Sequence, residues 1–189
     1  SLFSLCETRE GALWFGGANG VSVVREGRVT TNYTAEVGGL TGGEVFHIEQ
    51  GPDGRVWFRT REGLCFFDGQ RFQDVPGVSR FGSLRKIKPL AVAKDGTVWV
   101  VPKDEGALWR WDGQKMLPVA TELIRSDDSV DALHFDRQGR LWFQLGRRGW
   151  GRIEGDRAEA VVDEGPSWST FGAGLSFLEE EPGNYWIGA

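Results

Sequence analysis

The chain of 189 residues offers few side chains suited to catalysis: two histidines, His47 and His134, and two cysteines, Cys6 and Cys65. Acid–base catalysis, nucleophilic catalysis and zinc binding all need such groups held close together. The four lie far apart in sequence, and we interpret both histidines as lone polar side chains of strands, with a metal or catalytic role as the alternative. Each cysteine stands where an apolar residue would fit, so we expect free thiols rather than a disulfide. The sequence therefore predicts no catalytic residue, no metal site and no cofactor.

Basic and tryptophan side chains gather instead in stretches where a sequence repeat, described next, becomes irregular. A guanidinium presents a planar fork to carboxylates, sulfates or sugar hydroxyls, and an indole offers a face for stacking. An anionic or carbohydrate ligand could use both, whereas a solvated loop surface without a ligand is the alternative. The candidate ligand-binding residues are Arg59, Arg61, Arg85, Lys103, Arg147, Arg148, Trp150 and Trp168.

The elements that would position these residues follow from five tryptophans in one local frame, Gly-x-x-Trp. These framework tryptophans are Trp14, Trp57, Trp99, Trp142 and Trp186, at intervals of 43, 42, 43 and 44 residues. An acidic-Gly pair recurs in step, at residues 26–27, 68–69, 112–113 and 154–155. Because two independent markers share one period, the chain is predicted to be a repeat protein with units of about 43 residues.

Each unit contains four short β segments separated by glycine-containing turns, and Asp-Gly is a strong hairpin signal. Four antiparallel strands per unit form a β-propeller blade, and the framework tryptophans are expected to pack between blades. The fold class is therefore all-β: a propeller segment of about 4.4 blades, which we expect to be part of a larger ring. The predicted units are residues 1–43, 44–82, 83–127, 128–168 and a partial blade at 169–189.

Acidic residues of the turns recur so regularly that we interpret them as turn formers rather than paired catalytic carboxylates. A short carboxylate in such a turn accepts hydrogen bonds from backbone N–H groups a few residues further on. The residues in question are Asp53, Asp68, Asp95, Asp112 and Asp136.

The pattern Gly-x-[Leu/Val]-Trp-[Phe/Ile], followed by Gly-Leu-x-x-Phe-Asp-Gly, resembles the two-component regulator propeller repeat. The units that carry the resemblance best are residues 53–69, 10–20 and 183–188. This resemblance implies a ligand-sensing propeller, periplasmic or extracellular, in a bacterial histidine kinase or hybrid regulator, and non-catalytic in itself. It also implies an output domain such as a histidine kinase elsewhere in the parent chain.

Two other functions remain open. A propeller can serve protein–protein assembly, and residues 139–153 resemble repeats of streptogramin lyases, which would make the chain an enzyme. The net charge of −5 argues against nucleic-acid binding, and no run of 18 apolar residues could insert into a membrane. The expected partners are the remaining blades of the parent chain or a second copy of this one.

Overall fold

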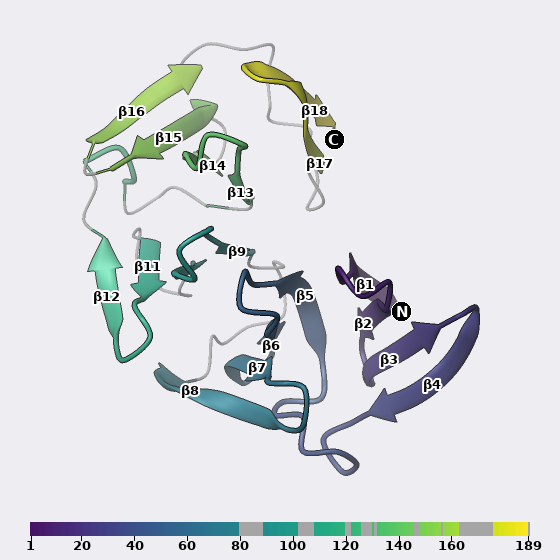
Figure 1. Ribbon diagram of the computed structural model, residues 1–189. Helices are drawn as coiled ribbons and strands as arrows, with labels where there is room; N and C mark the ends of the chain where they lie inside the picture. The colour runs from purple at the N-terminus through teal and green to yellow at the C-terminus, as the bar shows by residue number, and fades with distance from the viewer. Residues whose placement is uncertain are drawn as a thin grey trace.

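The computed structural model describes residues 1–79, 89–101, 108–119, 122–125, 130, 132–145, 148–155, 157–162 and 176–188. These residues contain eighteen β-strands and no α-helix. The strands form four antiparallel sheets of four strands and one of two strands, arranged as an arc around a common centre (Figure 1). The predicted all-β propeller fold is therefore confirmed.

Within each complete blade the strands follow chain order from the centre outward (Figure 1). The first blade contains β1 (Leu2–Glu7), β2 (Leu13–Gly17), β3 (Gly20–Arg25) and β4 (Arg28–Tyr33). The second contains β5 (Val45–Gln50), β6 (Val56–Thr60), β7 (Gly63–Phe67) and β8 (Phe72–Ser79). The third contains β9 (Leu90–Val92), β10 (Val98–Val100), β11 (Leu108–Trp111) and β12 (Met116–Val119). The fourth contains β13 (Leu133–Phe135), β14 (Leu141–Gln144), β15 (Trp150–Glu154) and β16 (Arg157–Val162), and the partial fifth contains β17 (Ser176–Glu181) and β18 (Asn184–Gly188).

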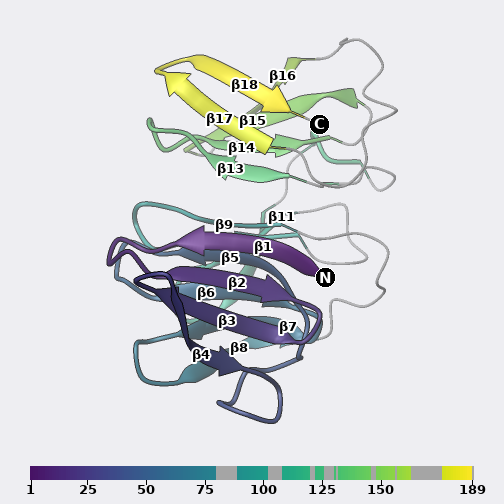
Figure 2. The same ribbon diagram turned by 90° about the vertical axis from the view of Figure 1, so that its right-hand side faces the viewer.

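The first hairpin of every blade turns at the glycine of the Gly-x-x-Trp frame. Gly11, Gly54, Gly96, Gly139 and Gly183 all have φ between 75° and 87°. A Cβ at any of them would meet no heavy atom within 4 Å, so the backbone conformation rather than crowding favours glycine there. In Figure 2 the β1–β2 and β17–β18 turns lie along one edge of the arc, and both chain ends lie along the opposite edge.

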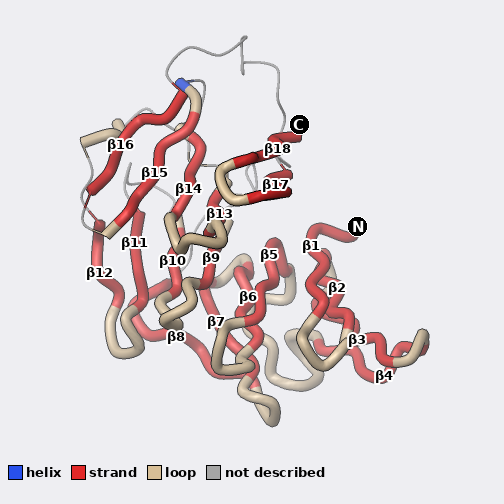
Figure 3. The backbone as a smooth tube through the Cα atoms, turned by 45° about the horizontal axis from the view of Figure 1, so that its top comes forward, coloured by secondary structure: helices blue, strands red, loops and turns tan. Residues whose placement is uncertain are grey.

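The core lies between blades rather than within one sheet. Each framework tryptophan of the complete blades, Trp14, Trp57, Trp99 and Trp142, belongs to an apolar cluster shared with the next blade. Trp14, for example, lies 5.5 Å from the rings of both Phe58 and Phe67 on the second blade. The tube view in Figure 3 shows the strands that carry these side chains standing side by side around the arc.

Candidate functional site

Arg59 lies at the end of β6 and is 2 % exposed. It points to the same side of the strand as Trp57, two residues earlier, because strand side chains alternate. Its guanidinium donates to the backbone oxygens of Thr60 and Gly63, and burial lowers its pKa to about 9. In this conformation Arg59 fixes the β6–β7 loop from inside.

Arg61 and Arg148 also form bonds within the chain. Arg61 donates through Nε to the Glu44 carboxylate, 2.7 Å away, and its backbone N–H bonds to the Glu44 oxygen. This pair ties the β6–β7 loop to the segment that enters the second blade. Arg148 donates to the backbone oxygen of Leu123, joining the β14–β15 connection to the segment after the third blade. A ligand at either residue would compete with an existing contact.

Trp150 is a core residue of the fourth blade, 1 % exposed, with its ring 5.6 Å from that of Phe177 on the fifth. It shares the side of the sheet occupied by Trp142. The remaining candidate ligand residues, Arg85, Lys103, Arg147 and Trp168, lie outside the described residues. The described candidates are thus placed at loops and at a blade junction.

His47 and Glu49 lie on the innermost strand β5, with His47 Nε2 and Glu49 Oε2 3.9 Å apart. About a third of each side chain reaches solvent. The surrounding blades nevertheless lower the pKa of His47 to about 4 and raise that of Glu49 to about 7, in both cases through desolvation. A backbone hydrogen bond at Val92 on β9 limits the rise at Glu49. Between pH 4 and 7 both groups are uncharged, so their contact is not an ion pair.

His134 occupies a different environment on β13. Its ring lies 4.5 Å from that of Phe177. Desolvation lowers the pKa of His134, and this effect outweighs the negative charges of Asp136 and Glu179, which act to raise it. Cys6 and Cys65 are free thiols, and burial raises the pKa of both, that of Cys65 to about 12. Across the described part of the chain, no three His, Cys, Asp or Glu side chains are grouped so that they could hold a metal ion.

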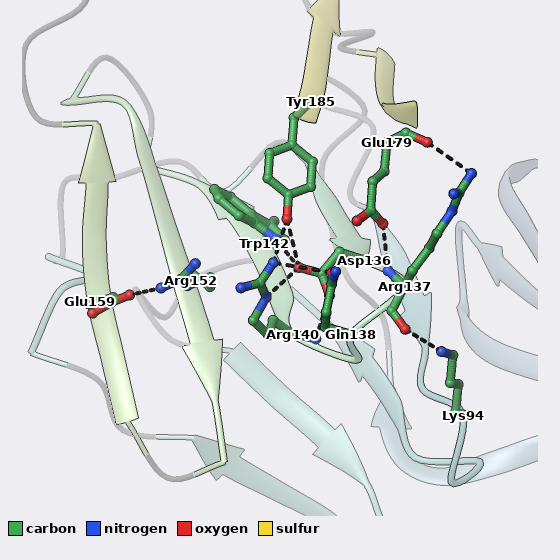
Figure 4. Close-up of polar contacts among 10 residues, drawn as sticks. All are labelled: Lys94, Asp136, Arg137, Gln138, Arg140, Trp142, Arg152, Glu159, Glu179 and Tyr185. Atoms are coloured by element: carbon green, nitrogen blue, oxygen red, sulfur yellow. Dashed lines mark hydrogen bonds and ion pairs between the residues drawn. The ribbon is translucent and has the colours of Figure 1, made fainter. Parts of the chain in front are cut away.

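A dense polar cluster surrounds Asp136, the residue that follows β13 (Figure 4). Its Oδ2 accepts hydrogen bonds from Arg140 Nε at 2.6 Å, Trp142 Nε1 at 2.8 Å and the Tyr185 hydroxyl at 3.2 Å. Its Oδ1 accepts from the backbone N–H of Arg140 at 2.9 Å. Burial alone would raise the pKa of Asp136, but the bonds from Trp142 and Arg140 outweigh it and hold the pKa below its usual value. Tyr185 comes from β18, so the carboxylate links the fourth blade to the fifth.

The carboxylate of Asp136 therefore does more than close a turn. Asp53, Asp68, Asp95 and Asp112 accept backbone N–H groups two or three residues further on, as the turn interpretation requires. Asp136 instead stands six residues before its tryptophan, whereas Asp53 and Asp95 stand four before theirs. The same six-residue spacing recurs in the fifth blade, where Trp186 Nε1 donates to Glu180 at 2.7 Å. This spacing was the signal in the sequence for an indole–carboxylate bond.

A second repeated contact joins neighbouring blades through the residue five before the framework tryptophan. Arg9 donates to the backbone oxygens of Gly51 and Pro52 on the next blade, and Lys94 donates to that of Arg137. Arg137 donates in turn to the backbone oxygen and the carboxylate of Glu179 (Figure 4). We call this set of contacts the basic clasp. The second blade carries Pro52 at this position, which has no N–H or cationic group to donate.

Comparison with known proteins gives a fold rather than a family. No protein-family model matches the chain, and no curated protein sequence does. Among solved structures, a streptogramin B lyase superposes with a TM-score of 0.73 at 14% identity, covering 98% of this chain and 61% of that one. A catalytically inactive virginiamycin B lyase from Staphylococcus aureus, solved with quinupristin, gives 0.67 at 16% identity, over 87% of this chain and 56% of that one.

An extracellular domain of a two-component system protein matches over a similar share of this chain. The extracellular domain of a protein described as a hybrid two-component system from B. thetaiotaomicron gives a TM-score of 0.67 at 17% identity, covering 98% of this chain and 25% of that one. The chain thus spans little more than half of each lyase and a quarter of the extracellular domain. At these identities the likeness shows the propeller fold, which the lyases and the extracellular domain share. No helix among the described residues is long and apolar enough to cross a membrane.

Proposed function

We propose that the chain is a ligand-sensing propeller segment of a bacterial two-component signalling protein, located in the periplasm or outside the cell. The observation that carries the proposal is the repeat itself. The Gly-x-[Leu/Val]-Trp and acidic-Gly frames run through the whole arc, and 98% of the arc superposes on an extracellular domain of a two-component system protein. Sensing needs no catalytic group, which agrees with a buried Cys65, a half-buried Cys6 and two histidines on separate blades.

The ligand we propose is an anion or a carbohydrate bound at the loop edge that carries Arg61. The salt bridge between Arg61 and Glu44 is partly exposed, so an anionic group can replace the Glu44 carboxylate at the guanidinium fork. Such a ligand must bind two states of the parent receptor with different affinities to produce a signal. The output domain, a histidine kinase or a comparable module, is part of this proposal.

The test is a thermal-shift screen with acidic and neutral oligosaccharides. A ligand present at about 100 times its dissociation constant stabilises a protein by about 2.7 kcal/mol, which is roughly 5–10 °C for a chain of this size. Arg61→Ala should reduce the shift. Arg71→Ala, in the turn at the opposite end of the second blade, should leave it unchanged. A shift that ignores both substitutions, or no shift across the screen, would count against this ligand class.

A lyase is the second candidate, and the TM-score of 0.73 with a streptogramin B lyase favours it. The enzyme resemblance in the sequence calls for a paired histidine and carboxylate beside a metal ion. The His47–Glu49 contact is the described pair of that kind, and it has no third metal-binding group beside it. Incubation with quinupristin, followed by chromatography, distinguishes the two functions. Turnover that is lost in His47→Ala would establish the enzyme, whereas an unchanged substrate supports the sensor.

Protein–protein assembly is the third candidate, and it predicts binding of a protein rather than a small molecule. The structural sign of such a role would be a large exposed apolar patch remote from the ends of the arc. Among the described residues, most of the large exposed apolar side chains lie instead on the first and fifth blades, with Val37 after β4 and Val161 on β16 as the others.

A further inference from the structure

The connection between β4 and β5 ends in a short segment, residues 41–44, which we call the strap. Buried apolar residues anchor it on both sides. Leu40 and Val45 are 1% and 0% exposed, and both belong to the apolar cluster at the first blade junction. The four residues of the strap are themselves partly exposed. The strap is therefore fixed at its two ends and accessible to solvent between them.

The backbone of the strap is a tight turn. Gly42 and Gly43 have φ of 87° and 61°, and the Glu44 N–H donates to the Gly42 oxygen at 2.6 Å. A three-residue turn with positive φ at its centre is the rare and strained form of the γ-turn. A Cβ at Gly42 would lie 2.8 Å from the backbone nitrogen of Glu62, so the strap packs directly on the β6–β7 loop. A strained turn of this kind depends on the surrounding contacts to hold it.

Arg61 supplies contacts of that kind. Its backbone N–H donates to the Glu44 oxygen at 3.0 Å, its Nε donates to Glu44 Oε2 at 2.7 Å, and its Nη2 contacts the same oxygen. We call this side-chain pair the latch. The Arg61 side chain is 40% exposed and that of Glu44 is 23% exposed. An ion pair open to water stabilises a protein only weakly, so an anion from solution can displace the Glu44 carboxylate.

We propose, on the basis of the sensing function proposed above, that Glu44 is a built-in competitor for the ligand at Arg61. Its carboxylate occupies the guanidinium in place of a carboxylate of the ligand, and binding of the ligand releases the strap. A carboxylate can place one oxygen opposite each of two guanidinium nitrogens and form two parallel hydrogen bonds. A neutral sugar brings no charge to replace that of Glu44. The ligand class is therefore a carboxylate-bearing molecule, such as an acidic sugar.

Release of the strap would act on the first blade junction. Glu44 is followed directly by Val45, which packs in one cluster with Trp14 of the first blade and Phe58 of the second. A ligand that binds the chain with the latch open, and not with the latch closed, shifts the balance between these two states. Glu44 thus supplies the differential affinity that a sensor needs.

Three variants separate competition from positioning. Glu44→Gln keeps the shape of the side chain and removes the competing charge. Glu36→Gln is the matched control, because it removes the same charge from an exposed residue of the same connection. Arg61→Ala removes the site. The probes are glucuronate, sulfate and glucose at constant ionic strength, and NMR titration gives a dissociation constant for each.

The dissociation constant for glucuronate should fall about two- to fivefold in Glu44→Gln, the range expected when a partly exposed ion pair no longer competes. It should stay unchanged in Glu36→Gln, and binding should be lost in Arg61→Ala. Sulfate and glucose should bind more weakly than glucuronate. Without any probe, the amide hydrogens of residues 44 and 61 should exchange about two- to fivefold faster in Glu44→Gln, because the strap opens more often.

Four results would overturn the proposal, and each identifies what fails. Equal or weaker binding of glucuronate by Glu44→Gln, still lost in Arg61→Ala, would overturn the competitor and leave the ligand site intact. Tighter binding of sulfate or glucose would overturn the carboxylate as the recognised group. Unchanged amide exchange in Glu44→Gln would overturn release of the strap, whatever binds. Binding of no probe, or binding that survives Arg61→Ala, would overturn the site and the competitor together.

Discussion

Replacing Asp136 with asparagine should destabilise the chain more than the same change at any other turn aspartate. Asparagine keeps the shape of the side chain but presents an NH₂ group in place of one carboxylate oxygen. If its oxygen stays with the backbone N–H of Arg140, the NH₂ group meets Arg140 Nε, Trp142 Nε1 and the Tyr185 hydroxyl, the donors now bound by Oδ2. The partly buried guanidinium of Arg140 would then lose its counter-charge, and the indole N–H of Trp142 would lose its acceptor.

The size of the effect follows from the burial of these groups. Breaking one partner of a buried ion pair costs about 3–5 kcal/mol. The Asp136 side chain is fully buried but that of Arg140 is 18% exposed, so water recovers part of the loss. We expect the lower end of the range, about 3 kcal/mol, which is roughly 6–12 °C in melting temperature for a chain of this size. The matched control is Asp53→Asn, whose side chain is 46% exposed and keeps an oxygen for the Arg55 N–H. The control should cost less than about 1 kcal/mol.

Urea unfolding followed by tryptophan fluorescence measures both variants. The pKa of Asp136 lies below its usual 3.8 in the folded chain, so its contribution is complete above pH 3.8 and disappears as the pH falls through the folded value. The difference in free energy of unfolding between wild type and Asp136→Asn should therefore stay constant from pH 8 to about pH 4 and disappear at lower pH. Equal free energies of unfolding for Asp136→Asn and Asp53→Asn would refute the reasoning.

Three further predictions test other features of the arc. Trp57→Ala should cost about 3–5 kcal/mol in urea unfolding, as expected for a buried tryptophan, and Trp186→Ala less than about 1 kcal/mol; similar costs would contradict the inter-blade role of the framework. Arg9→Ala should cost about 1–2 kcal/mol through its lost bonds to Gly51 and Pro52, and Arg28→Ala on the outer strand β4 less than about 0.5 kcal/mol; equal values would remove the basic clasp as a source of stability. The raised pKa of Glu49 lowers stability as the pH rises from 4.5 through about 7, whereas the lowered pKa of His47 raises stability between about 4 and 6.5, so the two contributions oppose each other. Glu49→Gln removes only the first, so its melting temperature should rise with pH in that window more steeply than that of the wild type; equal slopes would mean that Glu49 does not contribute.

The spacing of the tryptophans predicted the fold because a blade is a local unit, and every blade must bury one face against its neighbour. Side-chain roles within a strand were harder to predict. Arg59 looks like a loop residue, yet it lies two residues after Trp57, and alternation puts both on the face that the next blade covers. The same rule places Trp150 in the core, since its strand β15 pairs with β14 and gives Trp150 the side occupied by Trp142.

Contacts between blades were missed for a different reason. The clasp of Arg9, Lys94 and Arg137 and the Asp136–Trp142 bond become visible only when the units are aligned on their tryptophans and compared position by position. A basic residue five positions before the tryptophan looks like a solvated turn residue within its own blade. Its partner is a backbone oxygen about 43 residues away, and a backbone oxygen has no signature in the sequence.

The break in this pattern at Pro52 has a physical consequence for the arc. Junctions one–two, three–four and four–five each have a basic residue at the clasp position, whereas junction two–three has Pro52. Glu49 contributes there through its bond to Val92, and its raised pKa puts that contribution under the control of pH near neutrality. Motions that a ligand selects come from the less stable contacts of a structure. If the propeller signals through a shift between blades, junction two–three should therefore move first, and amide exchange on β9 should exceed that on β13.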